Sequence, residues 1–229
     1  MTSDKVTMNK VVPKSNVKCR KCKTCNETLA HILGQCIYTK TQRIRRHNEI
    51  RDFVSKKLAS KKKISIIEEV LISTPKGNLK LNLVVVNQGR FHVVDVTVRN
   101  EDTGYPEEGY RSKVEKYTPL LETLANQLKV ERGRVLPIVV GTRGSMPLFT
   151  IDSLREMHID DRGSYITIAL LALRHSIEIY HTFVDYDAKD TLTSKRRTLE
   201  LKQVTNGRAL YVRITGIKYT RDGRLNNYK

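Results

Sequence analysis

Asp95 and Asn82 are the two side chains whose types and positions most directly suggest chemistry. Asp95 lies inside the apolar run VVDVTV. Burying an ionised carboxylate there is costly unless it is paired or binds a metal. A second oxygen ligand from Asn82 would complete a site for a hard cation such as Mg²⁺. The alternative is that Asp95 lies on a solvated edge strand, but apolar residues flank it on both sides and the run lacks the clean alternation of such a strand.

The segment 80–98 must bring these two side chains together. It contains two runs of β-branched residues around Gln88-Gly89, a pattern that predicts a hairpin with a two-residue turn. Asn82 would then face Asp95, with Cβ atoms about 5 Å apart. A carboxylate beside a second oxygen ligand on a strand is the arrangement by which restriction-type nucleases hold Mg²⁺. Counting outward from the turn gives the remaining expected pairs, which are Asn87 with Arg90 and Lys80 with Thr97.

A second constellation lies near the N-terminus, where Cys19, Cys22, His31 and Cys36 have the spacing C-x2-C-x8-H-x4-C. Three thiolates and an imidazole suit tetrahedral Zn²⁺, and so short a segment needs the metal to fold. Cys25 leaves a second possibility, because Cys22 and Cys25 could form the first pair instead. We favour Cys19 and Cys22, and expect a structural zinc site of the CCHC knuckle type.

The charge balance points to a polyanionic partner. The 229 residues include 42 Lys and Arg against 24 Asp and Glu, giving a net charge of +18. Such an excess favours nucleic acid first and an anionic membrane surface second. The chain has no apolar run long enough to span a bilayer and no signal peptide, so we expect an intracellular protein that is not secreted.

The segment 40–63 concentrates this positive charge, with ten basic residues against only Glu49 and Asp52. Ile50, Phe53, Val54 and Leu58 recur at helical spacing, which predicts an amphipathic helix with a cationic outer face. Such a face is often only solvated, but the excess of bases beside a zinc knuckle favours phosphate contact.

The remaining patterns predict a mixed sheet flanked by helices, an α/β architecture. We expect further strands over 63–73 and 134–140, helices over 110–130, 152–157 and 164–183, and a hairpin over 198–219 around Asn206-Gly207, with Leu199 and Leu201 on one arm and Leu210, Val212 and Ile214 on the other. The helix over 110–130 should bury Tyr110, Val114, Tyr117, Leu121, Leu124 and Leu128, with a kink at Pro119. The expected division is a basic leader (1–18), the knuckle (19–39), the α/β domain (40–189) and an accessory hairpin (190–229).

These motifs together resemble the C-terminal part of site-specific non-LTR retrotransposon polyproteins, in which a CCHC knuckle precedes a restriction-like endonuclease domain. The resemblance covers roughly residues 19–187, in the family's order. It rests on C19-R-K-C22, E27-T-L-A-H31-I-L-G-Q-C36, R46-H47-N48, K80-L81-N82, V93-V94-D95-V96, K113-V-E-K116-Y117 and G141-T-R-G144. The thirteen-residue step from position 82 to Asp95 is its most specific part.

The resemblance implies a PD-(D/E)xK-type, Mg²⁺- or Mn²⁺-dependent DNA endonuclease that nicks target DNA for target-primed reverse transcription in the nucleus. Its metal-binding acids fall on position 82 and Asp95, and its helix lysine falls on Lys113 or Lys116, beside Tyr117. Implied partners are target DNA, the element RNA and the reverse transcriptase of the same polyprotein. We expect nucleic-acid contacts from Arg43, Arg45, Arg46, His47, Lys80 and Arg143.

This chain departs from the family pattern at two neighbouring positions. Leu81 and Asn82 replace the Pro and Asp of the K-P-D motif, and a neutral amide binds a hard cation less well than a carboxylate. Thr97 stands where many restriction enzymes carry lysine, which fits a family whose lysine has moved to the next helix. No polymerase sequence is present, so we expect a fragment or a stand-alone derivative. Two functions follow from these departures: an endonuclease inactivated or weakened by Asn82, or a module that binds nucleic acid without cutting it.

Overall fold

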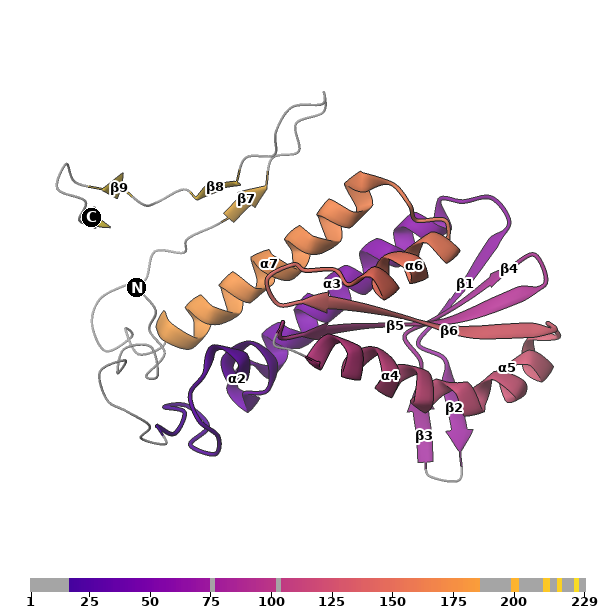
Figure 1. Cartoon of the computed structure of the whole chain (residues 1–229), viewed down its shortest axis with the longest axis horizontal. Helices are drawn as coiled ribbons and strands as arrows, with labels where there is room; N and C mark the ends of the chain where they lie inside the picture. Colours follow the sequence, from indigo (N-terminus) through magenta and orange to yellow (C-terminus); the bar gives the residue numbers. More distant parts are fainter. Residues whose placement is uncertain are drawn as a thin grey trace. The chain divides into compact units, whose positions relative to one another are not determined.

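A four-stranded mixed sheet forms the centre of the first of two compact units (Figure 1). The computed structural model describes residues 17–74, 77–101, 104–185, 199–201, 212–214, 218–219 and 225–226. The strand order is β1-β4-β5-β6, with β1–β4 and β4–β5 antiparallel and β5–β6 parallel. The elements of the first compact unit, residues 1–184, are α2 (Leu29–Gly34), η1 (Ile37–Thr39), α3 (Lys40–Ala59), β1 (Ile64–Glu68), β2 (Leu71–Thr74), β3 (Gly77–Lys80), β4 (Leu83–Asn87), β5 (Arg90–Arg99), α4 (Tyr105–Tyr117), η2 (Thr118–Leu120), α5 (Leu121–Leu128), β6 (Arg132–Gly141), α6 (Leu148–Glu156) and α7 (Arg162–Asp185).

Alternation along β5 divides the core between the two faces of the sheet. Val94 and Val96 pack with residues of α3, α6 and α7, whereas Phe91 and Val93 pack with residues of α4, η2 and α5. Asp95 has the same parity as Phe91 and Val93, so its side chain belongs to the α4 face. The expected mixed sheet flanked by helices is confirmed.

The central hairpin has the register that the two-residue turn predicted, since Asn87 pairs with Arg90 and Leu83 with Val94. The expected pairing of Lys80 with Thr97 is wrong, because Lys80 pairs with Leu71 in a separate β2–β3 hairpin. The chain leaves the sheet just before β4. The Leu81 N–H donates to the Val70 carbonyl, and the Asn82 carbonyl accepts from the Glu69 N–H. Residue 82 therefore lies just before β4, one position outside the ladder, whose last pair is Leu83 with Val94.

Several helices differ in extent from the sequence expectation, and α6 begins four residues before the expected 152. α3 ends at Ala59, whereas we expected a helix to 63. The helix expected over 110–130 begins at Tyr105, because Pro106 in the first turn is compatible with a helix start, and η2 interrupts it at Pro119. Tyr117 and Leu124 of the expected buried stripe are buried, and the other four are not fully buried.

The second compact unit, residues 185–229, contains two short antiparallel pairs, β7 (Leu199–Leu201) with β8 (Val212–Ile214) and β9 (Lys218–Tyr219) with β10 (Leu225–Asn226). Leu199 pairs with Ile214, and Leu201 with Val212, so the predicted arms are paired. The expected turn at Asn206-Gly207 and Leu210 lie outside the described residues. Within the described part of the chain, no helix is long and apolar enough to cross a membrane.

Candidate active site and zinc knuckle

Cys19, Cys22, His31 and Cys36 converge on one point, and their ligand atoms all lie within 4.8 Å of one another. The Cys19 and Cys36 Sγ atoms are 3.9 Å apart, and Cys22 Sγ is 3.2 Å from His31 Nε2. A tetrahedral zinc with ordinary bond lengths separates its ligands by about 3.5–3.8 Å. Cys25 is exposed and lies outside this group. The four residues favoured from spacing therefore form a set that could hold a zinc ion.

The pKa values of two of these thiols differ sharply. Burial opposes ionisation of Cys22, but hydrogen bonds from Thr24 and the backbone of Cys25 outweigh it and lower the pKa of the Cys22 thiol to about 5. Burial raises the pKa of the Cys36 thiol to about 11, and the neighbouring sulfurs of Cys19 and Cys22 add to the effect. Cys22 is thus better prepared than Cys36 to bind a cation as a thiolate.

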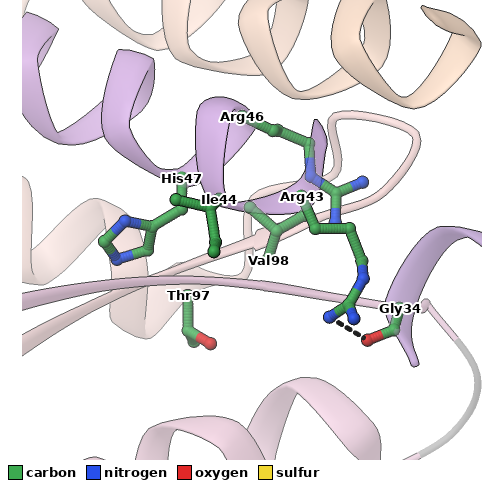
Figure 2. A pocket seen from close by; sticks show the side chains of 7 residues that line it. All are labelled: Gly34, Arg43, Ile44, Arg46, His47, Thr97 and Val98. Carbon is green, nitrogen blue, oxygen red and sulfur yellow. Dashed lines mark hydrogen bonds between the residues drawn. The ribbon is translucent and has the colours of Figure 1, made fainter. Parts of the chain in front are cut away.

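The knuckle is fastened to the remainder of the first compact unit on two sides. Its buried residues Cys19, Ile32 and Cys36 pack with Ile179 and Phe183 of α7. Arginines from α3 bind the carbonyl groups at the end of α2, as Figure 2 shows for one of these bonds.

Arg43 and Arg46 make these contacts from adjacent turns of α3. Arg43 Nη1 donates to the Gly34 carbonyl at 2.9 Å, and Nη2 donates to the Cys36 carbonyl at 3.1 Å. Arg46 is 2% exposed and donates to the Leu33 carbonyl and to Ser176 Oγ. Both were expected on a cationic outer face, but their guanidinium groups are bonded inside the protein, and Arg46 is absent from the surface.

Asp95 is 3% exposed and lies between two side chains of α4. The Tyr117 hydroxyl donates to Asp95 Oδ2 at 2.6 Å. Lys113 Nζ lies 2.8 Å from Asp95 Oδ1 as an ion pair, although its direction is not that of a hydrogen bond. Lys116 Nζ donates to the Tyr117 hydroxyl at 3.1 Å. The structure therefore brings together four of the five residues expected at the cutting centre.

Burial and charge shift the pKa values of this cluster. Burial, followed by the Asp95 charge, raises the pKa of Tyr117 far above its usual value, so the phenol stays protonated and donates. Burial, followed by the Lys113 charge, lowers the pKa of Lys116. The cluster combines one buried carboxylate with two cations and a permanent hydroxyl donor.

Asn82, the fifth expected residue, lies next to this cluster but its carbonyl oxygen is already occupied. The Val96 N–H donates to Asn82 Oδ1 at 3.2 Å, and His47 Nε2 lies 3.0 Å from the same atom. Because a backbone N–H can only donate, the atom facing it must be the amide oxygen, and His47 Nε2 is then the donor of the second hydrogen bond to it. Both lone pairs of Oδ1 are used, which leaves the amide nitrogen as the free end of the side chain.

The residues present do not fit the divalent cation that the resemblance implies. Asp95 Oδ1 makes no hydrogen bond but is already ion-paired with Lys113, and Asn82 offers no free oxygen beside it. A hard cation prefers several oxygen ligands. Among the described residues, the knuckle is the one group of three or more His, Cys, Asp and Glu side chains that could hold a metal.

The other expected nucleic-acid contacts are largely exposed and paired with acids. Arg45 pairs with Glu49, Lys80 with Glu69, and Arg143 with Glu101. On α3, Arg45 shares one stripe with Glu49, Asp52 and Lys56, so that exposed stripe is of mixed charge. Sequence reasoning missed the ion pairs of Lys80 with Glu69 and of Arg143 with Glu101, because each joins residues that only the folded chain brings together.

Comparisons with known proteins are limited to part of the chain, and no family model matches it. The chain is 33% identical over 132 residues to the "Retrovirus-related Pol polyprotein from type-1 retrotransposable element R2" of Popillia japonica. It is similar to part of a retrotransposon polyprotein. The match covers 55% of this chain and 27% of the relative. A solved protein of unknown function, AF1548, aligns with 58% of this chain and 97% of its own at 6% identity, with a TM-score of 0.29, too low to establish a shared fold.

Proposed function

We propose that this chain is a DNA endonuclease domain of a non-LTR retrotransposon protein, of the PD-(D/E)xK type, in which Asn82 leaves the cutting centre weak. The observation that carries the proposal is Asp95, a carboxylate buried on a central strand between Lys113 and Tyr117. Burying a carboxylate costs free energy that packing alone does not require, so a buried acid on a central strand points to a functional role. The partial match to the R2 polyprotein supports an origin in this class of element.

Each side chain around Asp95 has a role in handling a phosphodiester. Lys113 and Lys116 would neutralise the phosphate and its developing charge, and the Tyr117 hydroxyl holds Asp95 in place. A divalent cation would supply an activated water, but the oxygen of Asn82 is not free to bind it. We expect Mg²⁺- or Mn²⁺-dependent nicking to be weak or absent in this chain.

The same proposal assigns the knuckle a structural zinc, and gives the chain target DNA, element RNA and a reverse transcriptase of the same polyprotein as partners in the nucleus. Nicking of supercoiled plasmid with Mg²⁺ or Mn²⁺ tests the cutting function, with Asp95→Asn as the matched inactive control. Strong nicking that survives Asp95→Asn would refute this cutting centre.

A module that binds nucleic acid without cutting is the second candidate. The saturated oxygen of Asn82 favours it, because its two donors occupy a group that a cutting centre would need. Salt-dependent binding of an oligonucleotide, with no nicking by this chain or by its Asn82→Asp variant, would support this function over the first.

A further inference from the structure

A pocket of about 350 Å³ lies where β5 runs on past the end of β4, between α3 and the last turn of α2. Figure 2 shows the side chains of α3 above β5, with Val98 pointing toward them and Thr97 pointing to the other side of the strand. Its lining contains no acidic side chain and consists of Gly34, Arg43, Ile44, Arg46, His47, Thr97 and Val98.

At the unpaired edge of β5, the Val98 N–H group points toward this pocket. Val94 pairs with Leu83 of β4, and the Val96 N–H points the same way, to Asn82 Oδ1. In an extended strand every second residue directs its N–H to the same side. The Val98 N–H therefore points to the side where β4 has ended.

Positive charge at the pocket is not neutralised by its hydrogen bonds. Arg43 and Arg46 donate only to uncharged acceptors, the carbonyls at the end of α2 and the hydroxyl of Ser176. In the described part of the chain, no carboxylate lies within 4 Å of either guanidinium group as an ion-pair partner. Burial, followed by the charge of Arg43, lowers the pKa of Arg46 to about 10. Glu101 also acts on Arg46, but its carboxylate is already bonded to Thr142 and Arg143.

Unsatisfied donors accompany this charge. The Nε–H groups of Arg43 and Arg46 are buried and have no acceptor among the described residues. Buried donors without acceptors are uncommon in folded proteins. The pocket thus has positive charge and spare donors, and lacks a negatively charged acceptor.

We propose that this pocket binds a phosphate group of the nucleic-acid strand, next to the phosphate handled at Asp95. Thr97 lies two residues beyond Asp95 on the same face of β5, which is about 7 Å along the strand. The α3 residues that complete the pocket lie on the opposite face of the sheet from Asp95, so a strand that binds at both places would pass the free edge of β5. The identity of the strand rests on the proposed function, whereas the preference for an anion rests on the pocket alone.

Ile44 offers a way to change the pocket's charge without disturbing the fold. It lines the pocket and is 50% exposed, so glutamate, glutamine or lysine can replace it. Gln88→Glu is the matched control for Ile44→Glu, because it makes the same charge change at an exposed position. Gln88 lies in the turn before β5, about 33 Å from Val98 by strand length.

The experiment uses the full chain with its zinc and no added Mg²⁺. Inorganic phosphate is titrated while the Val98 amide is followed by ¹H–¹⁵N NMR, and an eight-nucleotide single strand is titrated by fluorescence anisotropy. We expect saturable shifts at Val98. Ile44→Glu should weaken both affinities roughly tenfold, Ile44→Lys should strengthen them, and Ile44→Gln and Gln88→Glu should change them less than about twofold.

Two outcomes would overturn the proposal. One is a Val98 amide that does not respond to phosphate, and the other is an equal loss of affinity in Ile44→Glu and Gln88→Glu, which would show a general charge effect. Asp95→Asn separates this pocket from the cutting centre, since it should leave phosphate binding intact. If Asn82→Asp does not nick DNA in Mg²⁺ or Mn²⁺ while phosphate still shifts Val98, the nuclease proposal fails and the pocket stands.

Discussion

An aspartate at position 82 would retain the hydrogen bonds that Asn82 makes and add a free carboxylate oxygen. The Val96 N–H and His47 Nε2 both meet Oδ1, so one oxygen of an aspartate would keep both partners. The second oxygen would replace the amide nitrogen at nearly unchanged volume. Together with Asp95 Oδ1, which a cation would take over from Lys113, it would give a divalent cation two carboxylates instead of one.

The size of the effect follows from the added charge. Two unit charges about 4 Å apart near a protein surface interact by roughly 4 kcal/mol, part of which desolvation offsets. A net gain of about 2.7 kcal/mol in the transition state corresponds to a hundredfold in rate. We therefore expect Asn82→Asp to nick plasmid at least about a hundredfold faster than the parent chain in Mg²⁺ or Mn²⁺.

The assay follows the conversion of supercoiled plasmid to the nicked form. In the Asn82→Asp background, Asp95→Ala should abolish the gain, and Lys113→Ala or Lys116→Ala should reduce it without impairing DNA binding. Without added divalent cation the two carboxylates repel, so the variant should melt at a lower temperature and recover on addition of Mg²⁺.

The reasoning fails if Asn82→Asp folds and binds DNA but cuts no better than the parent chain. Position 82 would then not supply a metal ligand. The donors that saturate its oxygen would be a purely structural feature, and the binding module would become the better description of the protein.

Three further predictions concern zinc, packing and pH. Elemental analysis should find one Zn²⁺ per chain, retained in Cys25→Ser and lost in Cys19→Ser; the opposite result would mean that Cys22 and Cys25 form the first pair. Denaturant unfolding should show Arg46→Met less stable by about 2–4 kcal/mol, because the Leu33 carbonyl and the Ser176 hydroxyl lose their donor, while Arg45→Met stays within about 0.5 kcal/mol. Burial opposes ionisation of Glu49, but the hydrogen bond with His175 and its cationic neighbours outweigh it and lower its pKa. Its stabilising effect is therefore present above the unfolded-state pKa of about 4.3 and is lost as pH falls through the folded value. Glu49→Gln should flatten the melting temperature over that acidic range, and an unchanged pH profile would contradict this assignment.

Local patterns predicted the hairpin, the zinc set and most of the helices. The turn at Gln88-Gly89 follows from two β-branched runs, and the pairing of Asn87 with Arg90 follows from counting outward. The four knuckle ligands follow from spacing, because a chain of some eighteen residues has few ways to bring three thiols and an imidazole together. These features depend on residues that are near neighbours along the chain.

The sequence pattern misplaced the boundary at Asn82. The segment 80–87 looks like one strand, yet Lys80 pairs with Leu71, and Glu69 and Val70 bond to residues 82 and 81. That choice depends on where β2 can pair, and β-branched composition alone does not distinguish one partner strand from another.

Only the tertiary structure decided which donors saturate the Asn82 oxygen and which arginines reach the surface. His47 is 35 residues from Asn82 and Val96 is 14, so the pair of hydrogen bonds exists only once α3, β4 and β5 have packed. Arg46 is buried because α3 presents it to Ser176, 130 residues away, and a helical charge pattern does not record that contact. Residue type and spacing determined which chemical groups this chain offers. Long-range packing determined which of those groups remain free, because a donor or acceptor that the fold has already paired cannot bind a ligand.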